Sequence, residues 1–225
     1  DENRAKITWS TPQTGANGGW IDASALTYKI TRLPDSIVVA ETTTGNEYID
    51  NSITKLNIYS YQIQAITPDG AGPTATTDRL VMGPALTVPY RCNFATDDQF
   101  ALWNVIDANN DEYTWKRETT LAAAYYYYNE DGETGGDDWL VSSPIHLEKN
   151  KIYRLKFKLQ SYDVGYPEKV AVHLGTEASV AEQTTLLGDY EVESNTFVEY
   201  KVILPERLES GNYHISFHCH SEPYM

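Results

Sequence analysis

The chain has 225 residues, enough for one large domain or two small ones, and 32 acidic against 17 basic side chains give it a formal net charge of −15. This charge repels phosphate backbones and anionic bilayers, so we expect no nucleic-acid partner and no membrane-surface partner. No apolar run approaches the roughly 18 residues of a membrane span, which excludes membrane insertion of this segment. The 17 tyrosines and the many threonines favour strands, and the sequence predicts an all-β fold.

The first 83 residues contain short stretches in which apolar and polar side chains alternate. The clearest are Leu26–Arg32 and Tyr59–Ala65, and turn sequences occupy 17–19 and 68–73. About seven short strands in fewer than 90 residues predict a small β-sandwich.

Four motifs in this region share one family pattern. They are Trp9-Ser10-x-Pro12, Leu26-x-Tyr28-x-Ile30-x-Arg32, Tyr59-x-Tyr61-x-Ile63-x-Ala65 and Gly70-x-Gly72-Pro73. As a set they resemble a fibronectin type III domain over residues 1–83. The resemblance implies that Trp9 packs in the core and that Tyr59 is a corner tyrosine anchoring a strand by a backbone hydrogen bond. These are signatures of a fold and carry no catalytic chemistry.

A short segment, 84–89, separates this region from the rest of the chain. Its two prolines disfavour strand pairing, so we expect a linker there and a second domain over 90–225. The charge changes at the same place, from −3 over residues 1–83 to −12 over residues 84–225. Most of the acidity therefore belongs to the second domain.

The second domain is again β by pattern, with one short helix expected at 176–184. The predicted strands are Trp103–Ile106, Leu121–Tyr128, Lys151–Leu159, Val170–Leu174, Thr196–Leu204 and Tyr213–Cys219.

Three segments of this half carry a second resemblance. They are Val105-Ile106-Asp107-Ala108-Asn109-Asn110-Asp111-x-x-Thr114-Trp115, Asp137-Asp138-Trp139-Leu140-Val141-Ser142-x-Pro144-Ile145-x-Leu147 and Gly211-x-Tyr213-x-Ile215-x-Phe217-His218. They resemble the cleaved-adhesin and choice-of-anchor jelly-roll domains of surface proteins in Gram-negative anaerobes. The resemblance implies a jelly-roll β-sandwich on an exported protein, adhesive or of unknown ligand. The family pattern continues past Met225, so we expect the closing strand to be absent from this chain.

The alternating oxygens of Asp107-x-Asn109-x-Asp111 predict a structural calcium site, with Asp138 completing the shell. Glu112 stands where an EF-hand requires glycine, so this is no EF-hand. Carboxylates crowd the region, with 11 acids between Asp97 and Asp138, and a cation would relieve their repulsion. An Asx-rich turn that needs no metal is the alternative interpretation.

Four consecutive tyrosines, 125–128, place alternate rings on opposite faces of a strand. An outward pair, Tyr126 and Tyr128, is a candidate for stacking on sugars or for filling a protein interface. Ordinary decoration of a sheet is the alternative.

Histidines recur on one face of the last predicted strand, at His214, His218 and His220. A His-x-His pair on a strand is able to bind zinc, but no further ligand lies nearby in the sequence, and imidazoles on a sheet face are commonly unliganded.

Cys92 and Cys219 lie on apolar rows that we assign to the first and last strands of the second domain. Those strands of a jelly roll lie close together, so the pair forms either a disulfide or two buried free thiols.

The sequence contains no nucleophile elbow, phosphate loop, dinucleotide fingerprint or metalloprotease helix. We therefore expect no enzyme but a non-catalytic adhesion or binding segment of a larger exported cell-surface protein. Its partners would be a host protein or glycan and the other domains of the same polypeptide. A carbohydrate-binding accessory module of an exported hydrolase is the alternative. Asp1, without a signal peptide, looks like the start of a processed or trimmed chain.

Overall fold

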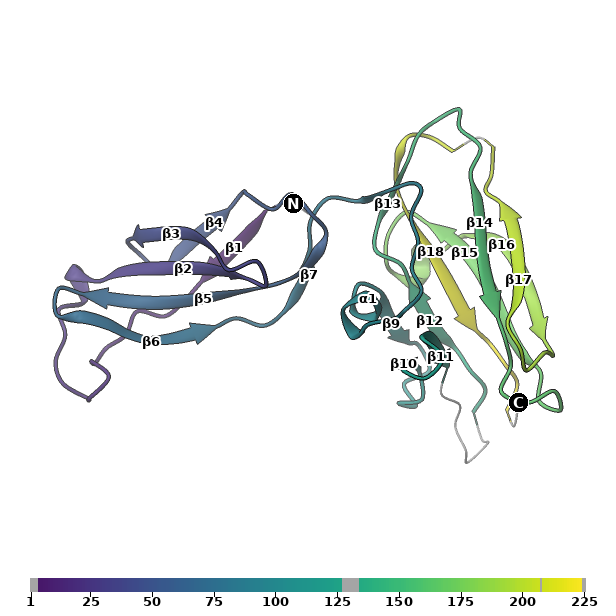
Figure 1. Ribbon diagram of the computed structural model, residues 1–225, viewed down its shortest axis with the longest axis horizontal. Coiled ribbons are helices and arrows are strands. Elements are labelled where there is room, and N and C mark those ends of the chain that lie inside the picture. Colours follow the sequence, from purple (N-terminus) through teal and green to yellow (C-terminus); the bar gives the residue numbers. More distant parts are fainter. Residues whose placement is uncertain (1–3, 127–133, 207, 224–225) are drawn as a thin grey trace. The chain divides into compact units, whose positions relative to one another are not determined.

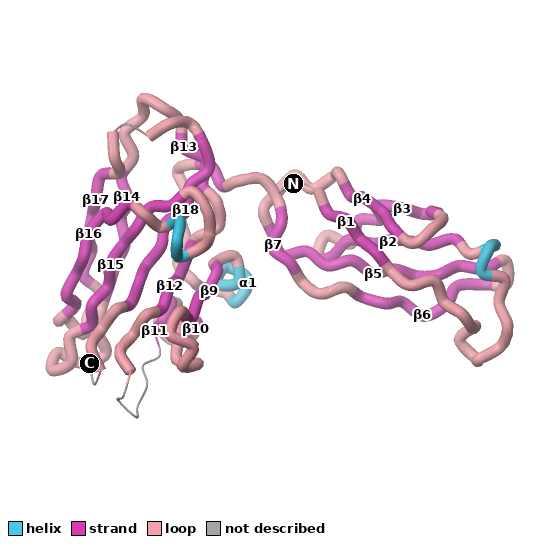
Figure 2. The backbone as a smooth tube through the Cα atoms, turned by 180° about the vertical axis from the view of Figure 1, so that it is seen from behind, coloured by secondary structure: helices cyan, strands magenta, loops and turns pink. Residues whose placement is uncertain are grey.

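The computed structural model describes residues 4–126, 134–206 and 208–223. The chain divides into two compact units, Asp1–Pro84 (unit 1) and Ala85–Met225 (unit 2). Nearly all regular structure in both units is strand, so the all-β prediction is confirmed (Figure 2). The units meet inside the segment 84–89 that the sequence marks as a linker, but Leu86–Thr87 of that segment form a strand that pairs with Ile145 and His146 of unit 2, so the flanking prolines did not prevent strand pairing there. Among the described residues, no helix is long and apolar enough to cross a bilayer.

Unit 1 consists of two antiparallel sheets (Figure 1). β1 pairs with β4, and the second sheet has the order β3-β2-β5-β6, with β7 also pairing with β5. The elements are β1 (Ala5–Thr8), a 3₁₀ turn η1 (Ala23–Ala25), β2 (Thr27–Leu33), β3 (Ile37–Thr43), β4 (Glu47–Asp50), β5 (Asn57–Thr67), β6 (Gly70–Thr76) and β7 (Leu80–Met82).

The core of unit 1 follows from the alternation in β2 and β5. Tyr28 and Ile30 of β2 are buried together with Tyr59 and Ile63 of β5. Trp9 packs against this cluster, with its ring 5.0 Å from that of Tyr28. The Tyr59 hydroxyl donates a hydrogen bond of 2.9 Å to the Lys55 carbonyl, the backbone anchor that the resemblance implied.

Unit 2 is built around one larger sheet with the order β16-β15-β18-β12-β9. In the same sheet β13 pairs with both β18 and β8. The pairs β10-β11 and β14-β17 form two separate sheets. The elements are β8 (Leu86–Thr87), α1 (Asp97–Ala101), β9 (Asn104–Asp107), β10 (Trp115–Glu118), β11 (Ala123–Tyr126), β12 (Asp138–Val141), β13 (Ile145–Leu147), β14 (Arg154–Leu159), β15 (Glu168–Gly175), the 3₁₀ turn η2 (Val180–Glu182), β16 (Thr185–Val192), β17 (Val198–Ile203) and β18 (Gly211–Cys219).

The core of unit 2 lies between the large sheet and the β14-β17 sheet. Val172 and Ile215 of the large sheet are buried in the same cluster against which Leu155 and Phe157 of β14 pack. The unit is therefore a two-layer sandwich, and each core strand turns alternate side chains away from the core.

Several predictions for unit 2 were incomplete or wrong. The helix expected at 176–184 is the three-residue turn η2, and the strand that follows it, β16, was not predicted. Gly188 and Asp189 interrupt the apolar pattern of β16, which explains the omission. Cys92 lies in a segment without regular structure, so its placement in a strand was wrong.

Candidate metal centre

Asp138 is the first residue of β12, between β9 on one side and β18 on the other. It pairs directly with Asp107 of β9 and with Cys219 of β18. Residues that face each other across an antiparallel pair point to the same side of the sheet. The interior face thus receives the Asp138 side chain, which is fully buried.

The loop after β9 ties the neighbouring carboxylates to its own backbone. The Asp107 carboxylate accepts hydrogen bonds from the N–H groups of Asp111 (3.3 Å) and Glu112 (2.9 Å). The Asp111 carboxylate in turn accepts one of 2.9 Å from the Tyr113 N–H. Backbone hydrogen bonding of this kind is that of an Asx-rich turn, so the alternative interpretation of the motif describes part of what is present.

The segment before β12 is fastened to this loop. The Asn109 side-chain amide donates to the Gly135 carbonyl (3.0 Å) and to Asp111 Oδ2 (3.2 Å). Thr134 donates a hydrogen bond of 2.9 Å to the same Asp111 oxygen. With Asp138 paired to Asp107, the four residues predicted as calcium ligands are brought into one region.

Three buried side-chain oxygens here lack a well-formed hydrogen bond among the described residues, although the Thr114 hydroxyl lies close enough to the Asp138 carboxyl to lower its pKa. They are Asp138 Oδ1, Asn109 Oδ1 and Thr114 Oγ1. No other side-chain oxygen in the described part of unit 2 is buried and unpartnered. Burying a polar atom without a partner is costly, and native folds usually supply a protein group, a water or an ion to such atoms. The region therefore has the donor atoms of a cation site.

The charge of Asp138 points the same way. Burial raises the pKa of its carboxyl to about 6, and the negative charges of Asp107 and Asp111 act in the same direction. Thr114 and the Asp137 N–H oppose the shift of the pKa without cancelling it. The Asp138 carboxyl is thus buried where two neighbouring acidic groups disfavour its charged form.

Two residues that the sequence reasoning did not select belong to the same acidic end. Burial raises the pKa of Glu168, at the start of β15, and the Ser221 hydroxyl donates a hydrogen bond to its carboxylate. Thr114 contributes one of the unpartnered oxygens. Glu168 lies 30 residues from Asp138 in the sequence, so no local pattern connects the two.

The donor set selects the class of ion. Among the described residues, no three His, Cys, Asp or Glu side chains converge on one point, so carboxylates alone do not form a shell. The unpartnered atoms are one carboxylate, one amide and one hydroxyl oxygen. Calcium accepts such mixed oxygen ligands, whereas zinc and copper prefer imidazole and thiolate.

The tyrosine run does not supply the outward pair that was expected. Tyr126 turns inward, packs in the cluster of Trp115 and Leu140, and meets the Trp115 ring edge-on at 6.0 Å. Burial raises its pKa, as do the acidic groups around it. The expectation that Tyr126 points outward is therefore wrong, and Tyr128 lies outside the described residues.

The histidines of β18 and of the segment just after it each have a protein partner. His214 lies 2.6 Å from the Ser142 carbonyl, and His220 lies 2.8 Å from the Asp189 carboxylate. His218 lies 2.8 Å from the Asp137 carboxylate and stacks on the Trp139 ring at 4.0 Å. These imidazoles are engaged in contacts that need no metal.

Both cysteines are free thiols. Cys219 is 1% exposed, and burial raises the pKa of its thiol to about 12. A thiol in that state is unreactive, since the thiolate is the nucleophile and the metal ligand.

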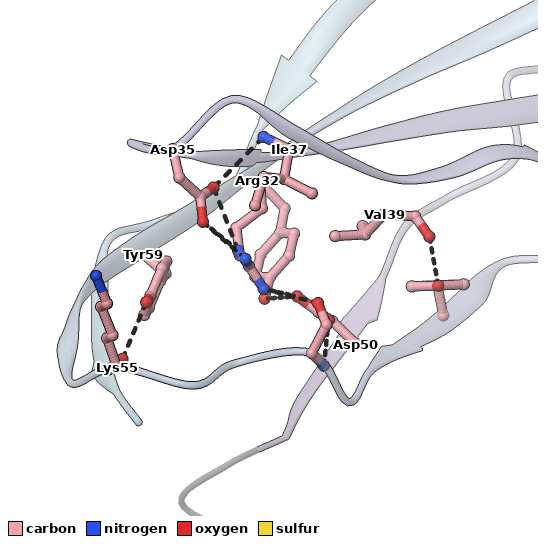
Figure 3. Close-up of polar contacts among 10 residues, drawn as sticks. Arg32, Asp35, Ile37, Val39, Asp50, Lys55 and Tyr59 are labelled. Atoms are coloured by element: carbon pink, nitrogen blue, oxygen red, sulfur yellow. Dashed lines mark hydrogen bonds and ion pairs between the residues drawn. The ribbon is translucent and has the colours of Figure 1, made fainter. Parts of the chain in front are cut away.

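Unit 1 holds a second polar cluster, in which every charge has a partner (Figure 3). Arg32 lies between Asp35 (2.7 Å) and Asp50 (2.9 Å), and the Tyr61 hydroxyl donates to Asp50 at 2.8 Å. Arg32 and Asp50 are 4% and 1% exposed. A paired, hydrogen-bonded cluster of this kind stabilises a fold and offers no open position to a ligand.

No family model matches the sequence, and no curated protein is significantly similar to it. Solved structures that are similar include the K1 cleaved adhesin domain of Lys-gingipain from Porphyromonas gingivalis W83, at 21% identity over 56% of this chain and 84% of that chain, with a TM-score of 0.46. Another is the C-terminal CBM6 of LamC, a laminarinase from Zobellia galactanivorans, at 12% identity over 54% of this chain and 91% of that chain, with a TM-score of 0.33. A third is the FN1-FN3 segment of chicken CNTN1, at 14% identity over 98% of this chain and 55% of that chain, with a TM-score of 0.28. At these scores the likeness carries no argument about ligand or activity.

Proposed function

We propose that the chain is a non-catalytic binding segment of an exported cell-surface protein, and that a calcium ion holds the acidic end of unit 2. The ligands would be Asp107, Asn109, Asp111 and Asp138, with the Thr114 hydroxyl as a further donor. One observation carries the proposal: side-chain oxygens of Asp138, Asn109 and Thr114 are buried without a well-formed hydrogen bond, in a region that also holds the carboxyl groups of Asp107 and Asp111. A bound cation would give those oxygens a partner and offset the charge.

A weak calcium site fits a protein that works outside the cell. Extracellular modules bind calcium with dissociation constants of about 10⁻⁴–10⁻³ M, which is sufficient where the ion is abundant outside cells. An exported protein would therefore have the site filled, and a structural role requires no exchange with substrate. The ion would fix the loop after β9 against the segment that enters β12.

The reactive groups of unit 2 support a binding role over catalysis. The Cys219 thiol is buried with its pKa raised to about 12, the opposite of an activated nucleophile. The partner would be a host protein or a glycan, alongside the other domains of the same polypeptide.

The alternative of a carbohydrate-binding accessory module loses one of the residues first selected for it, because Tyr126 packs inward. Among the described residues of unit 2, the exposed tyrosines are instead Tyr162 and Tyr166, at 83% and 59%, in the loop between β14 and β15. Glycan-array binding that disappears on changing Tyr162 and Tyr166 to Ala would favour this alternative.

The calcium site is tested by thermal unfolding of the whole chain with 10 mM calcium (about ten times the weakest dissociation constant expected) and with chelator. We expect calcium to raise the melting temperature of the native chain. Asp138→Asn removes the buried charge, so it should be at least as stable as the native chain in chelator and should lose the response to calcium. Glu191→Gln, an exposed change of the same charge on β16, should keep the response.

An unchanged melting temperature in chelator, together with no binding heat in calorimetry, would show that the loop is an Asx turn only. A calcium response that survives in Asp138→Asn would place the ion elsewhere.

A further inference from the structure

The β14-β17 sheet, whose two strands lie side by side in Figure 1, carries basic side chains in a unit that is strongly acidic. The two strands are antiparallel, and the inner row of β14, Leu155 and Phe157, packs on the core. Because side chains alternate along a strand, the residues between them point outward. The outward positions, all exposed, are Arg154, Lys156 and Lys158 on β14 and Glu199, Lys201 and Ile203 on β17; we call them the outer basic face.

The outer basic face has a formal charge of +3, since four of its residues are cationic and one is acidic. Residues 84–225 as a whole carry −12, which leaves −15 for the rest of unit 2. Lys156 stands directly opposite Lys201, an arrangement of like charges that destabilises a strand pair. Glu199 forms an ion pair with Lys201 at 2.9 Å, the one ion pair on this face in the described part of the chain.

The single acid of the face is influenced by several of these cations. The pKa of Glu199 is lowered by its hydrogen bond to Lys201 and by the positive charges of Lys201, Lys156 and Lys158. The cations therefore act on one common region of the surface, and one carboxylate offsets only part of their charge. An anionic partner would offset the remainder.

The geometry of the face selects the shape of that partner. Alternate residues of a strand are about 6.8 Å apart, so Arg154, Lys156 and Lys158 form a straight row of about 14 Å. The strip is two strands wide, and its centre consists of lysines, which are depleted at protein–protein interfaces. A linear polymer with anionic groups along its length matches a row of this kind better than a protein surface does.

We propose that the outer basic face binds a linear sulfated polysaccharide, with sulfate groups placed on Arg154, Lys156, Lys158 and Lys201. This inference rests on the proposed binding function and names its partner class. Duplex DNA, with one charge per about 1.7 Å, would extend its dense charge over the acidic surface beyond the strip and be repelled there. A sugar chain carries its charges on successive rings, at wider spacing.

The test is retention of the whole chain on immobilised heparin in chelator, so that calcium cannot bridge the two. Fully desulfated heparin is the second matrix. Lys156→Glu with Lys158→Glu is the test variant. Lys149→Glu with Lys169→Glu is the matched control: it changes the net charge equally, and both lysines lie in partly exposed ion pairs away from the face.

We expect the native chain and the control to be retained on heparin and the test variant to bind at least tenfold more weakly. The slope of log affinity against log salt should fall by about 2 in the test variant, about 1 for each lost contact to a polyanion. Neither the native chain nor the control should be retained on the desulfated heparin matrix. Thermal unfolding checks that both variants remain folded.

Equal loss in the control and the test variant would reduce the effect to net charge and overturn the proposal. So would retention that does not depend on sulfation, or displacement by single-stranded DNA as efficient as displacement by free heparin. The calcium response of the melting temperature is measured on the same samples. Its persistence without heparin binding would reject this inference and leave the calcium site standing.

Discussion

The two units bury carboxylates in opposite ways. In unit 1, Asp50 is 1% exposed and receives hydrogen bonds from Arg32, Tyr61 and Ser52. In unit 2, Asp138 is equally buried, but one of its oxygens lacks a well-formed hydrogen bond and the charges that act on it are those of Asp107 and Asp111, both negative. The pKa values diverge accordingly. That of Asp50 lies below its ordinary value, because its hydrogen bonds outweigh its burial, whereas burial raises that of Asp138 to about 6.

This difference separates a unit that supplies its own counter-charge from one that, under the proposed function, would take it from solution. The guanidinium of Arg32 is covalently part of unit 1, so that cluster is complete whenever the unit is folded. Among the described residues, unit 2 has the acidic half of such a cluster around Asp138 without the basic half. Its stability should therefore depend on the cation concentration, while that of unit 1 should not.

Removing the counter-anion in unit 1 should have the largest effect. Asp50→Ala leaves Arg32 buried with only Asp35 as its partner, and breaking a buried pair costs about 3–5 kcal/mol. Hydrogen exchange followed by mass spectrometry should show lost protection in peptides of unit 1 and unchanged protection in unit 2. Glu41→Ala, which removes the exposed partner of Lys29, should change protection little. Equal behaviour of the two variants would mean that the cluster is not a stabilising element.

Calcium should produce the next largest effect, in unit 2 alone. With dissociation constants of about 10⁻⁴–10⁻³ M, 10 mM calcium should stabilise it by about 1.4–2.7 kcal/mol. Protection of peptides that cover β9 and β12 should rise with calcium, and peptides of unit 1 should serve as the internal control. A rise spread over both units would contradict a local site.

Single hydroxyls of unit 1 give a smaller contrast. Tyr59→Phe removes the hydrogen bond to the Lys55 carbonyl and should cost about 0.5–1.5 kcal/mol of unfolding free energy. Tyr28→Phe removes a buried hydroxyl that has no partner among the described residues, so it should be neutral or stabilising. Denaturant unfolding of the two variants measures the difference, and the reverse order would refute the anchoring role of Tyr59.

Acid should produce the smallest change over the ordinary pH range. The folded pKa of Asp50 lies below its ordinary value of 3.8, so its contribution to stability is complete above that value and is lost as pH falls through the folded pKa. Exchange protection in unit 1, corrected for the intrinsic exchange rate, should be level from pH 7 to about 5 and fall below about 4. Asp50→Asn should lack this acid-dependent decrease. Should it show the same decrease as the native chain, another carboxylate is responsible.

Sequence patterns predicted the strands whose alternation is regular. β2 and β14 follow the predicted rows, since a strand with one buried face must alternate. β14 begins at Arg154 instead of Lys151, and β16 escaped prediction because Gly188 and Asp189 break its row. Propensity and period act locally, and they fail where a strand is held mainly by its neighbours.

The candidate site likewise has features that local sequence predicted and features that it did not. The sequence by itself determined the all-β fold, the acidity of the second half and the local oxygen pattern of Asp107, Asn109 and Asp111, because each of these depends on residues close together in the chain. Only the tertiary structure decided that Asp138 is buried opposite Asp107, that Glu168 lies at the same acidic end and that Tyr126 points inward. Strand register sets those positions, and register results from packing the whole sandwich, in which one residue of slip would turn every side chain to the other face.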